Sequence, residues 1–156
     1  MKTSIVTLLI TFCFYLSVYA QAPQDKATEL KEQALSSLKQ KDYIKARYLF
    51  KKAYEAFAVR ENYPQAIECG IQANALYVRE NFYKEGFELC RNMEQLIWTG
   101  EQKQNKVFYD LRFPISKERL QMYISLKNPA QAKNQLDKLE AVSYTHLRAH
   151  ETLRHL

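Results

Sequence analysis

The chain has 156 residues, of which 47% are hydrophobic, 23 are Lys or Arg and 17 are Asp or Glu. The formal net charge of +6 is spread along the chain among carboxylates, as in Lys117-Glu118-Arg119, and forms no basic stripe. Because this mixture is typical of solvated helix surfaces, it does not indicate a nucleic acid partner, and we expect none.

The first twenty residues have the pattern of a secretory leader. Lys2 supplies a positive start, an apolar run extends from Ile5 to Val18, and Val18-Tyr19-Ala20 offers a cleavage site. An uncleaved membrane anchor is the alternative, but the run is shorter than the roughly 18 residues that a span needs. We therefore expect residues 1–20 to be a cleaved signal peptide and the protein to be exported.

Beyond the leader, apolar residues recur at helical spacing and predict an all-α fold. A first stripe comprises Leu30, Ala34, Leu35 and Leu38. A longer stripe follows: Tyr43, Ala46, Phe50, Ala53, Tyr54 and Phe57. Alternating β-branched runs typical of strands do not occur in this part of the sequence.

The predicted helices pair into three hairpins within a single domain over residues 21–141. The hairpins are expected over about residues 28–58, 63–98 and 114–141. Gly100 is expected to stop the fourth helix, because glycine is common just past a helix end. Residues 101–113 are either a loop or the start of a long helix kinked at Pro114, and the sequence leaves both readings open.

One five-residue phrase recurs where helices are expected to begin. Asp42-Tyr43-Ile44-Lys45-Ala46 returns as Asn62-Tyr63-Pro64-Gln65-Ala66 and as Asn128-Pro129-Ala130-Gln131-Ala132, with a looser copy over residues 82–86. Each copy has a capping-type residue or an aromatic ring at the helix start and a small residue one turn later. Such repetition predicts stacked helical hairpins, in which the small residues allow close helix packing.

These residues resemble those of tetratricopeptide repeats. The first hairpin carries the resemblance through Leu30, Ala34, Tyr43, Ala46, Phe50 and Ala53. The second carries it through Ala73, Tyr77, Tyr83, Gly86, Cys90 and Met93, and the third through Leu120, Tyr123, Ala132, Leu136 and Leu139. The units are longer than the roughly 34 residues of the standard repeat, and its first-helix Trp and Gly are replaced. The resemblance implies an α-α superhelix of about three hairpins; an unrelated helical bundle is the alternative.

In tetratricopeptide arrays the first helix of each hairpin lines a groove that holds a peptide or protein segment. By that resemblance the groove would be lined by Lys31, Leu35, Leu38, Lys39, Ile71, Ala75, Val78, Arg79, Lys117, Gln121 and Ile124. Basic groups beside aliphatic ones would suit an acidic segment. The alternative is that the basic residues are solvated and the aliphatic ones pack between hairpins.

Two cysteines follow the leader, Cys69 and Cys90, at similar distances from the turn expected near Glu80. They could therefore lie level on adjacent helices, and export would permit a disulfide between them. Buried free thiols are the alternative, because a bridge between helices needs a close Cα separation.

A secretory leader followed by tetratricopeptide-like hairpins resembles the extracytoplasmic part of Bacteroidota signalling proteins. The resemblance implies the periplasm of a Gram-negative bacterium, or the outer side of its inner membrane. The expected function is a non-catalytic, exported module that binds protein or peptide. One alternative is the sensory domain of a membrane histidine kinase or transcriptional regulator, and another is a structural component of an envelope assembly. Membrane contact is expected only through an uncleaved leader or a missing C-terminal span.

Residues 142–156 resemble an adapter-derived peptide found at the ends of unrelated environmental sequences. We expect this tail to be non-native and the natural protein to continue beyond Ala141. All three histidines lie in the tail, His146 and His150 at a metal-ligand spacing that no third ligand completes. Residues 21–141 contain no pairing of nucleophile and base and no phosphate loop, so we expect no enzymatic activity, metal or cofactor.

Overall fold

The computed structural model describes the backbone of residues 25–154 and the side chains of residues 25–141. This part of the chain is all-α, as predicted, and has no strand. The expected signal peptide, residues 1–20, lies outside it. The helices are α2 (Lys26–Lys39), α3 (Tyr43–Val59), α4 (Tyr63–Arg79), α5 (Tyr83–Gln104), α6 (Tyr109–Ser125) and α7 (Pro129–Arg154).

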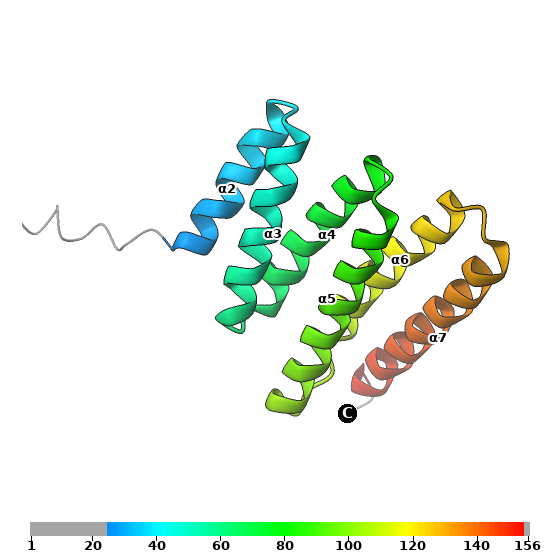
Figure 1. Ribbon diagram of the computed structural model, residues 1–156. Helices are drawn as coiled ribbons and strands as arrows, with labels where there is room; N and C mark the ends of the chain where they lie inside the picture. The colour runs from blue at the N-terminus through cyan, green and yellow to red at the C-terminus, as the bar shows by residue number, and fades with distance from the viewer. Residues whose placement is uncertain (1–24, 155–156) are drawn as a thin grey trace, which may run out of the picture.

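The helices follow one another across the molecule in chain order, so that α2 and α7 lie at opposite ends (Figure 1). Each helix packs against the next one in the sequence, and α4 also contacts α6. A continuous cluster of buried apolar side chains runs from α2 to α6. Its largest fully buried members include Phe50, Ile67, Met93, Ile115 and Met122. The result is a repeat-like helical architecture in which α4 occupies a central position.

Four of the turns between helices share one conformation. A residue with positive φ stands two positions before each following helix: Lys41 (62°), Glu61 (57°), Asn81 (63°) and Lys127 (53°). In each case the next backbone N–H donates back to the preceding helix, as Asp42 N does to the Ser37 carbonyl oxygen at 2.9 Å. The turns are therefore alike in their backbone although their sequences differ.

The recurring phrase does mark helix starts, as predicted. Three of its polar residues act as N-caps, because their side chains accept a hydrogen bond from a backbone N–H three residues later. The pairs are Asp42 with Lys45 (3.1 Å), Asn62 with Gln65 (3.4 Å) and Asn128 with Gln131 (3.2 Å). At α5 no side chain caps the helix.

The small residues of the phrase do not all have equivalent surroundings. Ala46 and Ala66 are fully buried, and Gly86 is buried against Met122 of α6. Ala132 is only partly buried, because it lies in α7, the last helix of the described residues, where no further hairpin covers it. The burial expected of these small residues is therefore found in α3, α4 and α5 and is weaker in α7.

The junction between α5 and α6 differs from the prediction. Gly100 does not stop the fourth helix but lies inside α5, which continues to Gln104 and ends at Asn105 in a left-handed conformation (φ 48°). The α5–α6 turn is short, and α6 begins at Tyr109 with Pro114 inside it. Residues 101–113 are thus mostly helix, and the second and third hairpins extend beyond the expected limits at residues 98, 114 and 141.

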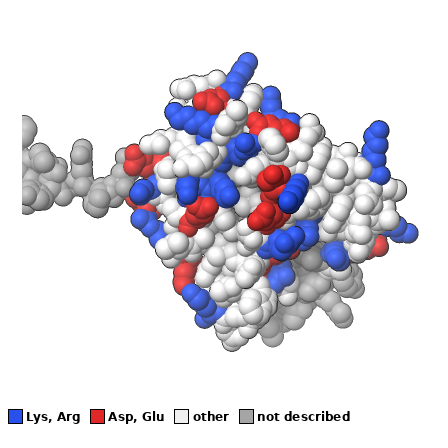
Figure 2. Space-filling model, in the orientation of Figure 1, with Lys and Arg blue, Asp and Glu red and all other residues white. Residues whose placement is uncertain are grey.

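The surface mixes charges of both signs. Figure 2 shows basic and acidic side chains interspersed over the visible face. Several of them form ion pairs between helices, such as Arg47 with Glu80 and Arg119 with Glu94. Within residues 25–154, no helix is both long enough and apolar enough to cross a membrane.

Candidate binding surfaces

The first helices of the three hairpins, α2, α4 and α6, lie side by side. The Lys31 ammonium of α2 donates to Gln65 Oε1 (2.8 Å) and pairs with Glu68 Oε2 (2.7 Å) of α4. Further along, Asn74 of α4 donates to Glu118 Oε2 of α6 at 3.0 Å. These polar links join each first helix to the next, so the three helices form one continuous side of the array, here called the α2–α4–α6 face.

The central helix of this face has a single exposed stripe. It consists of Pro64, Glu68, Gln72, Ala75 and Arg79, spaced at three or four residues. This spacing follows one side of a helix. The other sides of α4 are buried, because α3, α5 and α6 pack against them.

The structure divides the predicted groove residues into two groups. Those exposed on the α2–α4–α6 face are Leu35, Lys39, Ala75, Arg79, Lys117, Gln121 and Ile124. Those half-buried between helices are Lys31, Leu38, Ile71 and Val78. The three aliphatic members of the second group pack against the core cluster, so they support helix packing as well as lining the face.

Two of the predicted basic residues already have partners. Lys31 is held by Gln65 and Glu68, and the Arg79 guanidinium lies 3.7 Å from the centre of the Tyr43 ring. A cation over an aromatic face is stabilised electrostatically, so Arg79 contributes to the α3–α4 contact. Lys39 and Lys117 are exposed and form no ion pair with a described residue, which leaves them available to a ligand.

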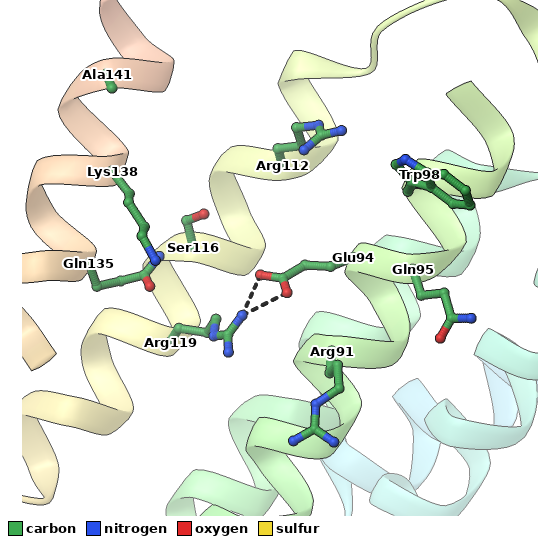
Figure 3. Close-up of a pocket in the computed structure, with 10 residues that line it drawn as sticks. All are labelled: Arg91, Glu94, Gln95, Trp98, Arg112, Ser116, Arg119, Gln135, Lys138 and Ala141. Carbon is green, nitrogen blue, oxygen red and sulfur yellow. Dashed lines mark hydrogen bonds and ion pairs between the residues drawn. The ribbon is translucent and has the colours of Figure 1, made fainter. Parts of the chain in front are cut away.

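A second candidate surface is a groove of about 680 Å³ between α5, α6 and α7, here called the α5–α6–α7 groove. Figure 3 shows side chains from all three helices around it, with Gln135 and Lys138 extending from α7 toward α6. Its lining residues are Arg91, Glu94, Gln95, Trp98, Arg112, Ser116, Arg119, Gln135, Lys138 and Ala141.

Ion pairs organise the floor of this groove. Arg119 Nη1 donates to both carboxylate oxygens of Glu94 at 2.7 Å and thereby joins α6 to α5 (Figure 3). The Nε of Arg119 is buried and has no hydrogen-bond partner among the described residues. At the end of the groove nearest the α5–α6 turn, Arg112 pairs with Glu101, whose side chain is only 8% exposed.

Glu101 connects three consecutive pieces of the chain. Its Oε1 accepts hydrogen bonds from the backbone N–H of Phe108 (2.8 Å) and from Arg112 Nε (3.0 Å). The hydrogen bonds from Arg112 and, to a smaller extent, from Phe108 lower the pKa of the Glu101 carboxyl below its ordinary value, although burial opposes the shift. An ionised Glu101 therefore fixes the turn that positions one wall of the groove.

Sequence reasoning missed the α5–α6–α7 groove. A signal was present in α5, where Arg91, Glu94, Gln95 and Trp98 recur at intervals of three, one and three residues on one helix side. That signal could not show which helices would face this side. The groove depends on the positions of α6 and α7, and the sequence left the start of α6 open between a loop and a helix over residues 101–113.

The two cysteines are free and buried in the structure, so the disulfide that export would permit is not formed. Burial raises the pKa of the Cys69 thiol to about 11 and that of Cys90 to about 12. A thiol with so high a pKa carries almost no thiolate at neutral pH and is a poor nucleophile or metal ligand.

Within the described residues, no group of three or more His, Cys, Asp or Glu side chains could hold a metal ion. Comparisons with protein-family models, with curated proteins and with solved structures find no match to this chain.

Proposed function

We propose that this chain is a non-catalytic, exported module that binds a protein or peptide segment on its α2–α4–α6 face. Its helices are proposed to be tetratricopeptide-like repeats forming an α-α superhelix. The recurrence of one turn conformation at Lys41, Glu61, Asn81 and Lys127 supports that part of the proposal. The leader pattern over residues 1–20 supports export.

The observation that carries the proposal is that three helices distant in sequence present one continuous face. Lys31 joins α2 to α4, and Asn74 joins α4 to α6. A segment lying across them would meet the free ammonium groups of Lys39 and Lys117. Between and beside these groups it would meet apolar side chains such as Leu35 (39% exposed) and Ile124 (55% exposed). Exposed cations beside apolar surface suit an acidic segment with interspersed apolar residues.

The burial of both thiols supports a binding role over a catalytic one. The ordinary nucleophile candidates, Cys69 and Cys90, are enclosed in the core and have raised pKa values. The exposed face carries Lys, Gln and aliphatic side chains at helical spacing, which provide contact area and charge but no pairing of nucleophile and base.

The proposal is tested with a random peptide library displayed on phage and selected on the full chain. Peptides enriched on the wild type are then measured on the Lys39→Glu/Lys117→Glu variant. We expect binding of one peptide group to weaken at least about tenfold, because two attractive charges become repulsive.

The matched control is Lys51→Glu/Lys84→Glu, which reverses two exposed charges on α3 and α5 outside this face. Circular dichroism should be unchanged in both variants. Equal binding of every enriched peptide to wild type and to Lys39→Glu/Lys117→Glu would reject the α2–α4–α6 face as the binding surface.

A further inference from the structure

The α5–α6–α7 groove carries an uncompensated positive charge. Four of its lining side chains are cationic and one, Glu94, is a carboxylate. Two of the arginines are paired, as described above, so the surplus comes from Arg91 and Lys138. Neither forms an ion pair with another described residue. Because Arg91 belongs to α5 and Lys138 to α7, the free charges stand on opposite walls of the groove.

An exposed aromatic ring lies in the same groove. Trp98, the only tryptophan of the chain, is 59% exposed although its large apolar surface would favour burial. Exposed tryptophan and arginine are the residue types that most often dominate binding at protein interfaces. A ligand that covered the indole would bury apolar area while remaining close to the free cations.

Only side chains, and no free backbone N–H groups, can donate hydrogen bonds to a ligand in the groove. All its lining residues lie within helices, where the backbone N–H groups are engaged in helical hydrogen bonds. Compact phosphate groups are typically bound at helix N-termini, where free backbone N–H groups converge. The α5–α6–α7 groove instead offers separated charges and an apolar ring, which suit an extended ligand with spaced carboxylates.

We infer that the α5–α6–α7 groove binds an acidic peptide segment of a partner protein. Its carboxylates are held by Arg91 and Lys138 from opposite walls, and an apolar side chain of the segment packs on Trp98. The paired Arg119 and Glu94 form a polar floor that keeps α5 and α6 in place beneath the segment. This site is distinct from the α2–α4–α6 face. If the inference about the groove failed, the proposal for that face would still stand.

The test uses the same phage-displayed random peptide library and the full chain. One selection is made on the wild type and one on the Arg91→Glu/Lys138→Glu variant. We expect a group of peptides rich in Asp and Glu, with a flanking apolar residue, to be enriched on the wild type and lost on the variant. A synthetic peptide from this group should change the fluorescence of Trp98, and its affinity should fall at least about tenfold in the variant. An amide counterpart of this peptide, with Asn and Gln in place of Asp and Glu, should bind the wild type as weakly as the acidic peptide binds the variant.

The Lys51→Glu/Lys84→Glu variant again serves as the matched control, and circular dichroism checks that each variant is folded. The α2–α4–α6 face is intact in the groove variant, Arg91→Glu/Lys138→Glu, so acidic peptides that bind there should stay enriched. If every acidic peptide enriched on the wild type were enriched equally on the groove variant, the inference would be overturned. If inorganic phosphate displaced the bound peptide at the same concentration as free glutamate-rich peptide does, the groove would be a general anion site instead. A dimer that forms through this groove in place of peptide binding would also overturn it, and sedimentation would detect that dimer.

Discussion

At the scale of single residues, Glu101 shows how one buried carboxylate can fix a turn whose conformation differs from that of the other four turns. The α5–α6 turn lacks the cap found at three of the other turns, and Glu101 supplies hydrogen-bond acceptors to Phe108 and Arg112 instead. A charge-assisted hydrogen bond of this kind is stronger than a neutral one. The local stability of the turn therefore depends on the ionisation of Glu101.

This dependence has a definite sign. The pKa of Glu101 is lowered from an ordinary value of 4.5, so the folded chain binds this proton less readily than the unfolded chain. The stabilisation is fully present above about pH 5 and is lost as the pH falls below 4.5 through the lowered pKa. We expect Glu101→Gln to lower the melting temperature at pH 7, and we expect this effect to shrink progressively as the pH falls below 4.5. The measurement is a series of thermal melts over pH, with Glu88→Gln on the exposed side of α5 as the control; a pH-independent difference would contradict the expectation.

A second residue-scale prediction concerns the left-handed turns. Lys41 adopts φ 62°, a conformation that costs a side-chain-bearing residue roughly 1 kcal/mol or more but costs glycine almost nothing. Because glycine also increases the entropy of the unfolded chain, we expect Lys41→Gly to stabilise the fold by less than about 1 kcal/mol. Lys51→Gly, inside α3, should instead destabilise it by roughly 1 kcal/mol. Urea unfolding of both variants measures this, and destabilisation by Lys41→Gly would show that the turn needs its side chain.

At the scale of helices, the sequence was sufficient wherever a boundary depends on neighbouring residues. The caps at Asp42, Asn62 and Asn128 are local signals, and the helices begin where those signals predict. Gly100 was misread because glycine usually follows a helix end, whereas here it makes room for the ring of Tyr63 in α4. A contact between residues so far apart in the sequence leaves no local signal. The α5–α6–α7 groove was missed for the same reason, because three helices must be placed before it exists.

The role of Gly100 leads to a prediction with an unusual sign. Gly→Ala inside a helix normally stabilises by roughly 0.5–1 kcal/mol. At Gly100 an added Cβ would lie 2.7 Å from the Tyr63 ring, so we expect Gly100→Ala to destabilise the fold. In a Tyr63→Leu background the same substitution should be much less harmful, because the ring is gone. Chemical unfolding of the two single variants and the double variant measures this coupling, and additive effects would contradict the proposed contact.

At the scale of the whole molecule, helices contact mainly their neighbours in the succession. In such an array stability is approximately a sum of local terms and interfaces between neighbours, so it need not be uniform. The central helix α4 contacts α3, α5 and α6, whereas α7 packs chiefly on α6. The core cluster also stops at α6, although Leu139 of α7 is itself buried.

We therefore expect amide hydrogen exchange to be slowest in α4 and fastest in α7, with opening that begins at the C-terminal end. Exchange followed by mass spectrometry on the full chain tests this gradient. Uniform protection from α2 to α7 would indicate a single cooperative unit and would contradict the expectation.

The left-handed residues Lys41, Glu61 and Asn81 are evenly spaced along the chain, and each belongs to the same type of turn. A copy of residues 43–82 inserted after Phe82 would therefore begin and end at junctions of matching shape. The array could be lengthened by duplicated pairs of helices without redesigning any connection. Gene duplication followed by drift is thus an accessible route by which such a chain could acquire a longer or shorter binding surface.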